Sequence, residues 1–355
     1  PSPVAKQWEK VPEGRMRASL RESCWWKEAL IRPAGHLLPS FGREKGHTRT
    51  FMAKIKRTPV HGWVILDKPY GMSSTQAVGK VRWLFNAEKA GHGGTLDPLA
   101  SGLLPIALGE ATKTVSYAMD GRKVYRFTAT WGEERSTDDL EGEVTVRSDK
   151  RPTREEIESI LPRFTGEIMQ APPAYSAIKV DGERAYDLAR AGETVELAER
   201  PILIEALKLV EATPDHATLE VTCGKGTYIR TLARDMGRAL GTAAHVSMLR
   251  RIAVGPFTEG HMISLENLTE LSHKADGGNA MNGALLPIET VLDGIPALAV
   301  DEEKARRLKL GQAVLLRGAN APIVCDAVLM MSGAKPLGIG HISEGTLKPK
   351  RLFNL

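Results

Sequence analysis

Apolar and polar residues alternate along the chain with two different periods, and each period predicts one kind of element. Alternation or short apolar runs predict β-strands at 62–69 (GWVILDKP), 123–131 (KVYRFTATW), 202–212 (ILIEALKLVEA) and 217–223 (ATLEVTC). The strand at 123–131 places four residues on one face: Tyr125, Phe127, Ala129 and Trp131. A further apolar run, LLPIAL, is suited to packing beneath the loop that precedes it.

Apolar residues three or four positions apart predict helices between these strands. The first helix follows Gly71 and has three candidate capping residues, Ser73, Ser74 and Thr75. Its buried face consists of Val78, Val81, Leu84 and Phe85. Another helix carries Glu110 in its first turn, and a helix over 153–164 begins with a capping box of Thr153 and Glu156.

A fourth helix lies in GKGTYIRTLARDMGRALG (224–241), where it opens at Thr227 and stops at Gly241. Its buried stripe consists of Ile229, Leu232, Met236 and Leu240. Lys225, Tyr228 and Arg230 gather at its N-terminus, where backbone amides attract anions. From the residues alone, a surface arginine and a packed tyrosine explain this cluster equally well.

The length of 355 residues favours two domains, and 42% hydrophobic residues suffice for a large core. Residues 272–283 have the Gly, Asn and Asp content of a loop or hinge, and we expect a domain boundary nearby. From about 297 the chain predicts a short charged helix and then short strands around 313–317, 323–331 and 337–342. It ends in the basic tail KPKRLF, whose Lys348, Lys350 and Arg351 suit phosphate contacts or a solvated tail.

The net charge of +5 is carried entirely by residues 1–51, which hold ten Lys plus Arg against five Glu. The remaining 304 residues have 38 basic and 38 acidic side chains, so affinity for RNA there requires local clustering. Residues 1–51 also lack a sustained apolar period. We therefore expect them to be a disordered or artefactual extension, with the folded chain starting near Met52.

Several classes of protein are disfavoured by the sequence. It has no apolar run of transmembrane length and no signal-peptide core, which favours the cytoplasm and no membrane association. Cys24, Cys223 and Cys325 are odd in number, far apart and without a second ligand at metal spacing, which disfavours a disulfide framework and a zinc site, so we expect no metal. Walker, GxSxG, HExxH and paired CxxC motifs do not occur.

The most constrained stretch is GHGGTLDPLASG (91–102), which places one carboxylate, that of Asp97, in a glycine-rich loop. Gly93 and Gly94 permit unusual backbone angles, and Pro98 pushes Asp97 towards an extended conformation. Taken alone, such a loop is better explained by a carboxylate that caps a neighbouring helix.

Together, these ordered motifs resemble the TruB family of tRNA pseudouridine synthases over roughly residues 60–260. The resemblance implies that Asp97 is the single catalytic aspartate and that Arg230 pairs with it. It also implies that Tyr125 stacks on the target base and assists the final deprotonation, although periodicity alone makes Tyr125 a core aromatic. Lys225 and Tyr228 become active-site residues on the same basis.

The resemblance implies further substrate contacts. His92 is expected to unstack or replace the flipped base, and Leu249 to form an apolar wall, with an ordinary core residue as the alternative for Leu249. Residues 170–193 correspond to a thumb that grips RNA, in which Tyr175 and Lys179 touch the substrate. As sequence alone, this stretch reads equally as a solvated surface loop. Arg250 and Arg251 are expected near backbone phosphates.

The implied fold is α+β, with a mixed, mainly antiparallel central sheet flanked by helices and loops. Residues 52–285 would form the pseudouridine synthase domain, and 296–355 a small β-barrel-like PUA domain that binds RNA. The implied reaction isomerises the T-loop uridine of tRNA, conventionally position fifty-five, after base flipping. It needs no cofactor. The expected partner is the T-arm stem-loop of tRNA, and we expect a monomer without an obligate protein partner.

Three chemical roles for Asp97 stay open in the sequence: attack on the anomeric carbon, abstraction of the 2′ proton to give a glycal, or attack on the base ring. Two other functions also stay open. A guide-RNA-dependent enzyme of the dyskerin type shares the catalytic motif, and a tRNA-folding chaperone would use the same binding surface with catalysis secondary.

Overall fold

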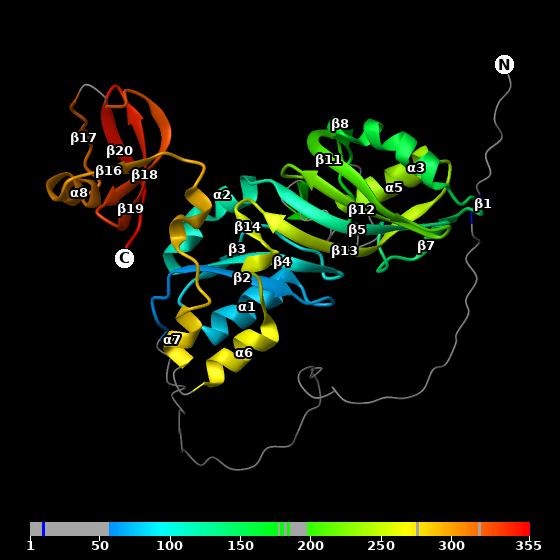
Figure 1. The fold of residues 1–355 in the computed structure, drawn as a ribbon, viewed down its shortest axis with the longest axis horizontal. Coiled ribbons are helices and arrows are strands. Elements are labelled where there is room, and N and C mark those ends of the chain that lie inside the picture. Colours follow the sequence, from blue (N-terminus) through cyan, green and yellow to red (C-terminus); the bar gives the residue numbers. More distant parts are fainter. Residues whose placement is uncertain are drawn as a thin grey trace, which may run out of the picture. The chain divides into compact units, whose positions relative to one another are not determined.

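The computed structural model describes residues 9–10, 57–176, 178–180, 183–184, 197–274, 277–318 and 321–355 (Figure 1). The expected N-terminal extension, 1–51, lies outside these residues except for the two-residue strand β1 (Glu9–Lys10). β1 pairs with β7 (Val144–Arg147), which also pairs with β6 (Glu133–Arg135).

In the described part of the chain, ten strands form one mixed sheet in the order β15-β2-β4-β13-β5-β12-β11-β8, with β3 beside β4 and β14 beside β13. The β4–β13 and β2–β15 pairs are parallel, and the other pairs are antiparallel. The strands are β2 (Gly62–Lys68), β3 (Ala90–His92), β4 (Ala100–Leu108), β5 (Lys123–Trp131), β8 (Gly166–Gln170), β11 (Arg200–Ala212), β12 (His216–Cys223), β13 (Ala244–Val254), β14 (Phe257–Thr258) and β15 (Ile263–Ser264). The four strands predicted from apolar patterning are thereby confirmed.

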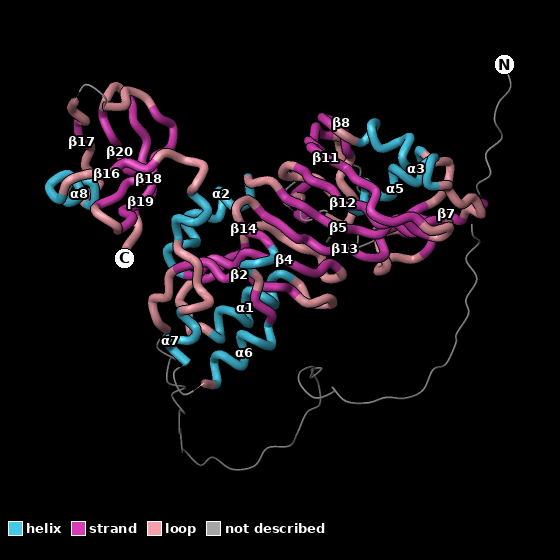
Figure 2. Tube along the Cα trace, viewed as in Figure 1, coloured by secondary structure: helices cyan, strands magenta, loops and turns pink. Residues whose placement is uncertain are grey.

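Helices cover this sheet at two places, as Figures 1 and 2 show. α1 (Ser74–Leu84) and α6 (Leu265–His273) lie at the β2–β4 end, and α3 (Arg154–Ile160) and α5 (Ile229–Ala239) lie over the β5–β12–β11 end. The shorter elements are η1 (Gly109–Thr114), α2 (Val115–Asp120), η2 (Leu161–Phe164), η3 (Glu259–His261), α7 (Gly277–Asn282) and η4 (Ile288–Leu292).

The predicted helix starts are mostly confirmed. Ser73 caps α1 through a capping box with Gln76, and Thr153 caps α3 through the predicted box with Glu156. α5 begins at Ile229, two residues later than predicted, because Tyr228 is extended and occupies the N-cap position. Gly241 follows the C-cap with φ +72°, which is the left-handed stop expected of a glycine there.

The interpretation of 272–283 as a loop or hinge is wrong. α6 runs to His273 and α7 occupies Gly277–Asn282, so most of this stretch is helical despite its Gly and Asn content. Met281 is buried in the main core, and this burial outweighs the low intrinsic helix propensity of glycine.

The C-terminal residues form a separate five-stranded sheet in the order β16-β18-β19-β20-β17. Its elements are β16 (Ala297–Ala299), α8 (Glu302–Lys309), β17 (Val314–Leu315), β18 (Cys325–Ser332), β19 (Lys335–Ser343) and β20 (Thr346–Leu352). This arrangement is consistent with the expected PUA-like domain. The basic residues Lys348, Lys350 and Arg351 are exposed, as expected of solvated side chains, but they lie in strand β20, which the sequence did not predict. Buried Leu347 of β20 joins the small core of the sheet.

The main core lies between α5, α1 and the central sheet. The predicted stripe of α5 is buried, with Ile229, Leu232, Met236 and Leu240 each at most 5% exposed. On β5, Phe127, Ala129 and Trp131 are buried as predicted, whereas Tyr125, at the start of the same face, is only half-buried. The apolar period therefore identifies the face of the strand that packs, although Lys123, the next residue on this face, is buried as well.

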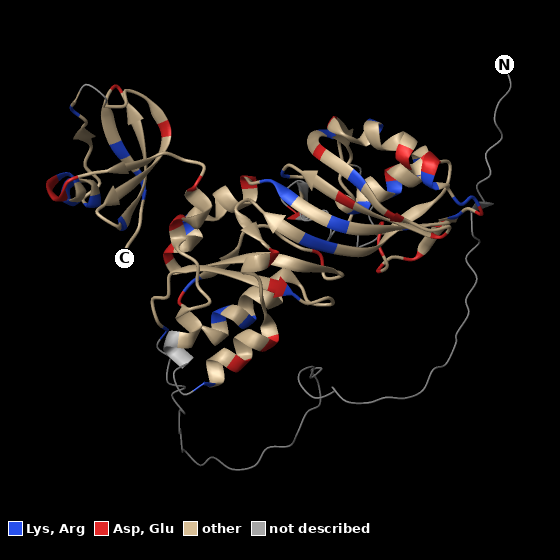
Figure 3. Ribbon diagram, viewed as in Figure 1, with Lys and Arg blue, Asp and Glu red and all other residues tan. Residues whose placement is uncertain are grey.

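Charged side chains of both signs are interspersed over the described elements, in line with the balanced charge beyond residue 51 (Figure 3). Within the described residues, no helix is long and apolar enough to cross a membrane.

Gly102 in β4 gives a direct test of how tightly the sheet is packed beneath the Asp97 loop. Its φ is +95°, and a Cβ there would lie 2.3 Å from the carbonyl oxygen of Arg251. We expect Gly102→Ala to lower the free energy of unfolding by about 3 kcal/mol or more, through backbone strain plus a backbone clash. Urea unfolding provides the measurement.

Gly333→Ala is the matched control, because Gly333 also has a left-handed φ (+58°) but nothing within 4 Å of an added Cβ. It should cost only about 1–2 kcal/mol, the backbone strain alone. Equal losses in the two variants would contradict the close approach of β4 and β13 at Gly102.

Candidate active site

The loop that carries Asp97 joins β3 to β4 and is held through its backbone. The Ser74 hydroxyl at the start of α1 donates to the carbonyl of Leu96 at 2.8 Å and accepts from the Leu96 amide at 2.8 Å. On the other side of Asp97, the Gly71 amide donates to the carbonyl of Pro98 at 2.9 Å. Both neighbours of Asp97 are thus fixed, and its side chain has little freedom of position.

Two buried cations lie beneath the same loop. Arg251 donates from Nη2 to the carbonyl of Gly94 at 3.0 Å, from Nη1 to that of Thr95 at 3.3 Å, and from Nε to that of Leu103 at 2.8 Å. Lys68 Nζ donates to Met72, Pro69 and Pro98 carbonyls at 2.6, 3.0 and 3.4 Å. Each of these carbonyls is satisfied in the protein interior, where an unpaired one would be costly.

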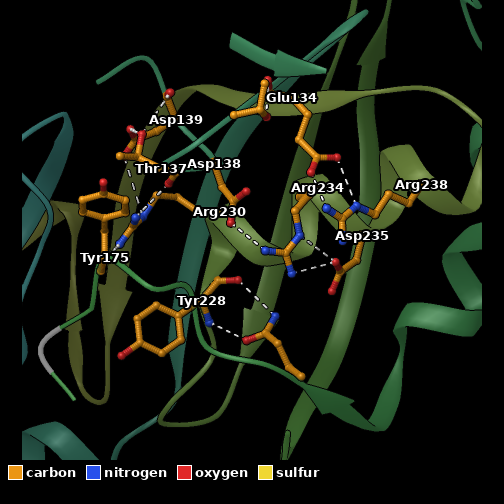
Figure 4. A network of polar contacts seen from close by, with 12 residues as sticks. Glu134, Thr137, Asp138, Asp139, Tyr175, Tyr228, Arg230, Arg234, Asp235 and Arg238 are labelled. Carbon is orange, nitrogen blue, oxygen red and sulfur yellow. Dashed lines mark hydrogen bonds and ion pairs between the residues drawn. The ribbon is translucent and has the colours of Figure 1, made fainter. Parts of the chain in front are cut away.

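Arg230, in the first turn of α5, holds the Asp97 side chain itself. Its Nε donates to Oδ2 of Asp97 at 2.9 Å, Nη1 to the carbonyl of Thr137 at 2.9 Å and Nη2 to the carbonyl of Tyr175 at 2.9 Å (Figure 4 shows the last two). Oδ2 of Asp139 lies 3.7 Å from the same Nε. The ion pair between Asp97 and Arg230, which the resemblance implied, is present.

The two partners differ in exposure. The Arg230 side chain is 6% exposed, whereas that of Asp97 is 37% exposed. The guanidinium donates a hydrogen bond from each of its three nitrogens and is fixed, whereas more than a third of the Asp97 side chain stays exposed. Asp97 is therefore the member of the pair that a substrate can reach.

Asp97 borders a cavity of about 460 Å³, a size in the range of small-ligand pockets. Seven of the nine residues predicted for the site line it: Asp97, Tyr125, Tyr175, Lys225, Tyr228, Arg230 and Leu249. They come from the loop, β5, β13, the start of α5 and the segment after β8. The structure thus brings together residues that are more than 150 positions apart in the chain.

The other two predicted residues are placed differently. His92 ends β3 but does not line the cavity, and its Nδ1 is buried without a hydrogen-bond partner among the described residues. Burial, reinforced by nearby Arg251, lowers the pKa of His92, so its imidazole is neutral at neutral pH. Lys179 opens β9 (Lys179–Val180), which pairs with β10 (Glu183–Arg184), and its side chain lies outside the described part of the chain.

Two tyrosines provide aromatic faces on the cavity. Tyr228 is fixed by Gln170, whose Oε1 accepts from the Tyr228 amide at 2.8 Å and whose Nε2 donates to the Tyr228 carbonyl at 3.1 Å. The guanidinium of Arg200 lies 5.5 Å from the Tyr228 ring centre. Tyr125 has Arg251 6.0 Å from its ring centre, and burial raises the pKa of its phenol, so the hydroxyl is protonated at neutral pH.

Leu249 is a buried residue of the cavity wall, whereas Lys225 is exposed at the cavity rim. Leu249 is 9% exposed and pairs in register with Phe127 of β5, so its side chain serves both the core and the cavity wall. Lys225 is at the rim, where its largely exposed ammonium donates to Oδ1 of Asp120 at 2.8 Å. An exposed pair of this kind contributes little to stability and is free to exchange partners.

The expectation that Arg251 lies near RNA phosphates is wrong. Arg251 is 1% exposed, and its donors are taken by three backbone carbonyls under the loop. Arg250, which points to the other face of β13, binds Asp67 through two hydrogen bonds at 2.9 and 3.1 Å. Successive residues of a strand face opposite ways, and the sequence alone did not say which of the two faced the core.

Comparison with known proteins agrees with this geometry. Profiles described as the TruB family pseudouridylate synthase N-terminal domain, the tRNA pseudouridylate synthase B C-terminal domain and the pseudouridine synthase II TruB C-terminal domain match residues 82–229, 230–293 and 296–353. The chain is 60% identical to the tRNA pseudouridine synthase B of Bradyrhizobium diazoefficiens, over 89% of this chain and 91% of that protein. It is 54% identical to that of Brucella melitensis, over 84% and 98%.

The chain belongs to the TruB family of pseudouridine synthases.

Solved structures extend the likeness. A chain from a Cbf5–Nop10–Gar1 complex matches with a TM-score of 0.63 and 26% identity, over 82% of this chain and 84% of that one. A chain from the archaeal box H/ACA sRNP Nop10–Cbf5 complex matches with the same TM-score and 25% identity, over 82% and 85%. The fold is therefore the pseudouridine synthase fold, as expected.

Sequence reasoning missed several residues of this TruB site. Asp139 and Lys123 line the cavity, and Lys68 is completely buried below the Asp97 loop. Burial lowers the pKa of Lys123 to about 8, assisted by the charge of Arg251. The adjacent acids Asp138 and Asp139, just after a strand, could have indicated a functional site. They were missed because apolar periodicity gives no weight to acidic residues. Among the described residues, no group of three or more His, Cys, Asp or Glu is placed to hold a metal ion.

The buried ammonium of Lys68 predicts how stability depends on pH. Burial lowers its pKa from 10.5 to about 8, with Asp97 opposing. Between these values the native lysine is mostly neutral while the unfolded one is protonated, so stability rises with pH in this window. We expect the free energy of unfolding of the wild type, relative to Lys68→Met, to rise by up to about 3 kcal/mol across this window. This rise is the equivalent of moving the pKa from 10.5 to about 8. Urea unfolding at a series of pH values measures it.

Lys89→Met, which removes an exposed lysine, controls for general effects of alkaline pH. Its stability difference from wild type should stay flat over the same range. Parallel curves for wild type and Lys68→Met would show that the buried ammonium does not titrate there.

Proposed function

We propose that this TruB protein converts a uridine of the tRNA T arm into pseudouridine, with Asp97 as the catalytic carboxylate. The observation that carries the proposal is the half-exposed Asp97 carboxylate, fixed by Arg230 at the edge of an aromatic-lined cavity. The relatives named tRNA pseudouridine synthase B support tRNA as the substrate.

The cavity suits a nucleotide that has left its RNA stack. Tyr125 and Tyr228 offer faces for a uracil ring, and base–aromatic stacking contributes about 1–3 kcal/mol per base. Leu249 supplies an apolar wall beside them. Loop nucleotides are the natural substrate class, because unstacking them costs less than opening a duplex.

The isomerisation breaks the C1′–N1 bond, turns the uracil within the cavity and forms a C1′–C5 bond. No electrons or groups leave the nucleotide, so the reaction needs no cofactor. Asp97 either attacks the anomeric carbon, removes the 2′ proton or attacks the base ring, and in each case it must stay ionised beside Arg230. We assign the neutral phenol of Tyr125 to hydrogen bonding during the final loss of the C5 proton.

Binding of the tRNA extends beyond the cavity in this proposal. Lys225 at the rim can exchange Asp120 for a phosphate, and Tyr175 and Lys179 belong to the proposed RNA-gripping thumb, 170–193. His92 is proposed to act on the flipped base from the end of β3. We propose that the protein acts in the cytoplasm as a monomer, with the T-arm stem-loop as its partner and no obligate protein partner.

Asp97→Asn tests the proposal. It keeps the size of the side chain but removes the charge, so we expect pseudouridine formation to fall by at least about 10³-fold, the scale of losing a nucleophile or general base. Binding of the T-arm transcript should change little. Tritium release from uridine labelled at C5 measures turnover, and filter binding measures affinity.

Asp215→Asn is the matched control, because the Asp215 side chain is 79% exposed and pairs only with Arg151 among the described residues. It should retain wild-type turnover. Appreciable tritium release by Asp97→Asn would assign the chemistry to another group.

The likeness to Cbf5 favours one alternative, a synthase that requires a guide RNA and partner proteins. We expect instead that the purified chain alone isomerises an unmodified T-arm transcript, because its identity to the synthase B relatives is more than twice its identity to Cbf5. Mass spectrometry of the product RNA locates the pseudouridine. Activity that appears only after addition of guide RNA would favour the alternative.

A further inference from the structure

Three arginines of α5 are spaced four residues apart, so they project from one face of the helix in successive turns. Each one meets an acid from the segment between β5 and β7, as Figure 4 shows. Arg230 lies near Asp139, Arg234 binds Asp138, and Arg238 binds Glu134. The middle pair touches no part of the cavity, and the reaction as proposed does not use it.

The pair of Asp138 and Arg234 is close and buried. Arg234 Nη1 donates to Oδ2 of Asp138 at 2.9 Å, with side-chain exposures of 17% and 7% for the arginine and the acid. Burial raises the pKa of Asp138 to about 6, with Glu134 acting in the same direction. Arg234 is the strongest opposing influence, with smaller ones from Arg230 and Arg238, so the ionised carboxylate depends on its partner.

Asp138 also has an unusual backbone. Its φ is +61°, the left-handed region that residues with a side chain rarely adopt. Its carbonyl accepts from the Val246 amide of β13 at 2.9 Å, which fixes the turn on the sheet side. The carboxylate bound to Arg234 fixes the same residue on the helix side. A strained residue is thus held from two directions.

The position of Asp138 also determines where its two neighbours in the chain lie. The carbonyl of Thr137 accepts from Arg230 Nη1 at 2.9 Å, and the carboxylate of Asp139 lies 3.7 Å from Arg230 Nε. Both contacts act on the guanidinium that binds Asp97. A shift of the turn at Asp138 would therefore move two of the groups that orient Arg230.

We propose that Asp138 and Arg234 are a positioning pair, which holds the Thr137–Asp139 turn so that Arg230 stays aligned with Asp97. Neither residue touches the substrate. The inference rests on the proposed function of Asp97 for its effect on turnover, but the alignment of Arg230 can be measured without turnover.

The kinetic test uses Asp138→Asn, Arg234→Gln and their combination. We expect each single change to lower kcat by about 10–100-fold, the scale of a small misalignment, while KM for the T-arm transcript stays within about twofold. The double variant should match Arg234→Gln, because both single changes remove the pair of Asp138 and Arg234 and only Arg234→Gln also removes the contact of Arg234 with Asp235. Arg234→Lys, which retains the charge, should recover part of the loss.

Arg238→Gln is the matched control, since it removes the next pair on the same helix face, which has no contact with Arg230. It should retain the wild-type kcat. Thermal melting of all variants separates misalignment from unfolding. If Asp138→Asn does not fold, the kcat of Arg234→Lys compared with that of Arg234→Gln still measures the effect of losing the pair.

The independent readout is hydrogen exchange of the Arg230 Nε–H, followed by NMR of arginine-labelled protein. That proton is bonded to Asp97, so we expect Asp138→Asn and Arg234→Gln to speed its exchange by about tenfold or more and Arg238→Gln to leave it unchanged. Wild-type kcat and wild-type exchange in the folded Asp138→Asn and Arg234→Gln variants would overturn the proposal. If the wild-type protein releases no tritium but the two variants still exchange faster, the positioning role stands and the proposed function is rejected.

Discussion

The structure around Asp97 depends on one buried cation, the guanidinium of Arg230. A charge at 6% exposure requires partners in the protein, and the three nitrogens of Arg230 find them in the Asp97 loop, the turn at Thr137 and the segment at Tyr175. These three segments come from distant parts of the chain. The need to satisfy a single side chain therefore brings together the catalytic loop, one wall of the cavity and the base of the proposed thumb.

Two more buried cations complete the frame. Arg251 and Lys68 bind carbonyls on either side of Asp97, so the loop is held by its backbone while its one carboxylate remains reachable. The positive charges nearest to the site are thus committed to the protein. At the rim, Lys225 pairs with the exposed carboxylate of Asp120 and is the lining cation best placed to meet an RNA phosphate. Because the buried cations near the site bind the protein itself, the net charge does not indicate the function of this chain.

The sequence predicted the strands and the main helices because their apolar period matches the face that packs. The apolar stripe of α5 and the alternation of β5 are the clearest cases. The motifs also predicted seven lining residues of the cavity. The features that the sequence did not predict depend on tertiary packing. Arg251 rather than Arg250 faces inwards, and 277–282 is helical because Met281 is buried. The basic C-terminal residues form β20 because Leu347 packs in a sheet. Roles for Asp139 and Lys68 likewise depend on contacts between distant segments.

The proposed reaction requires the target uridine to leave its stack and meet the Asp97 carboxylate held by Arg230. The most direct measurement is a crystal structure of the protein with a T-arm RNA whose target uridine is replaced by an analogue that cannot be isomerised. We expect the analogue to lie in the cavity of about 460 Å³, with its ribose or ring within about 3.5 Å of Asp97 and the ion pair to Arg230 intact. A target base that remains stacked in the RNA, or that lies against another carboxylate such as Asp120, would contradict it.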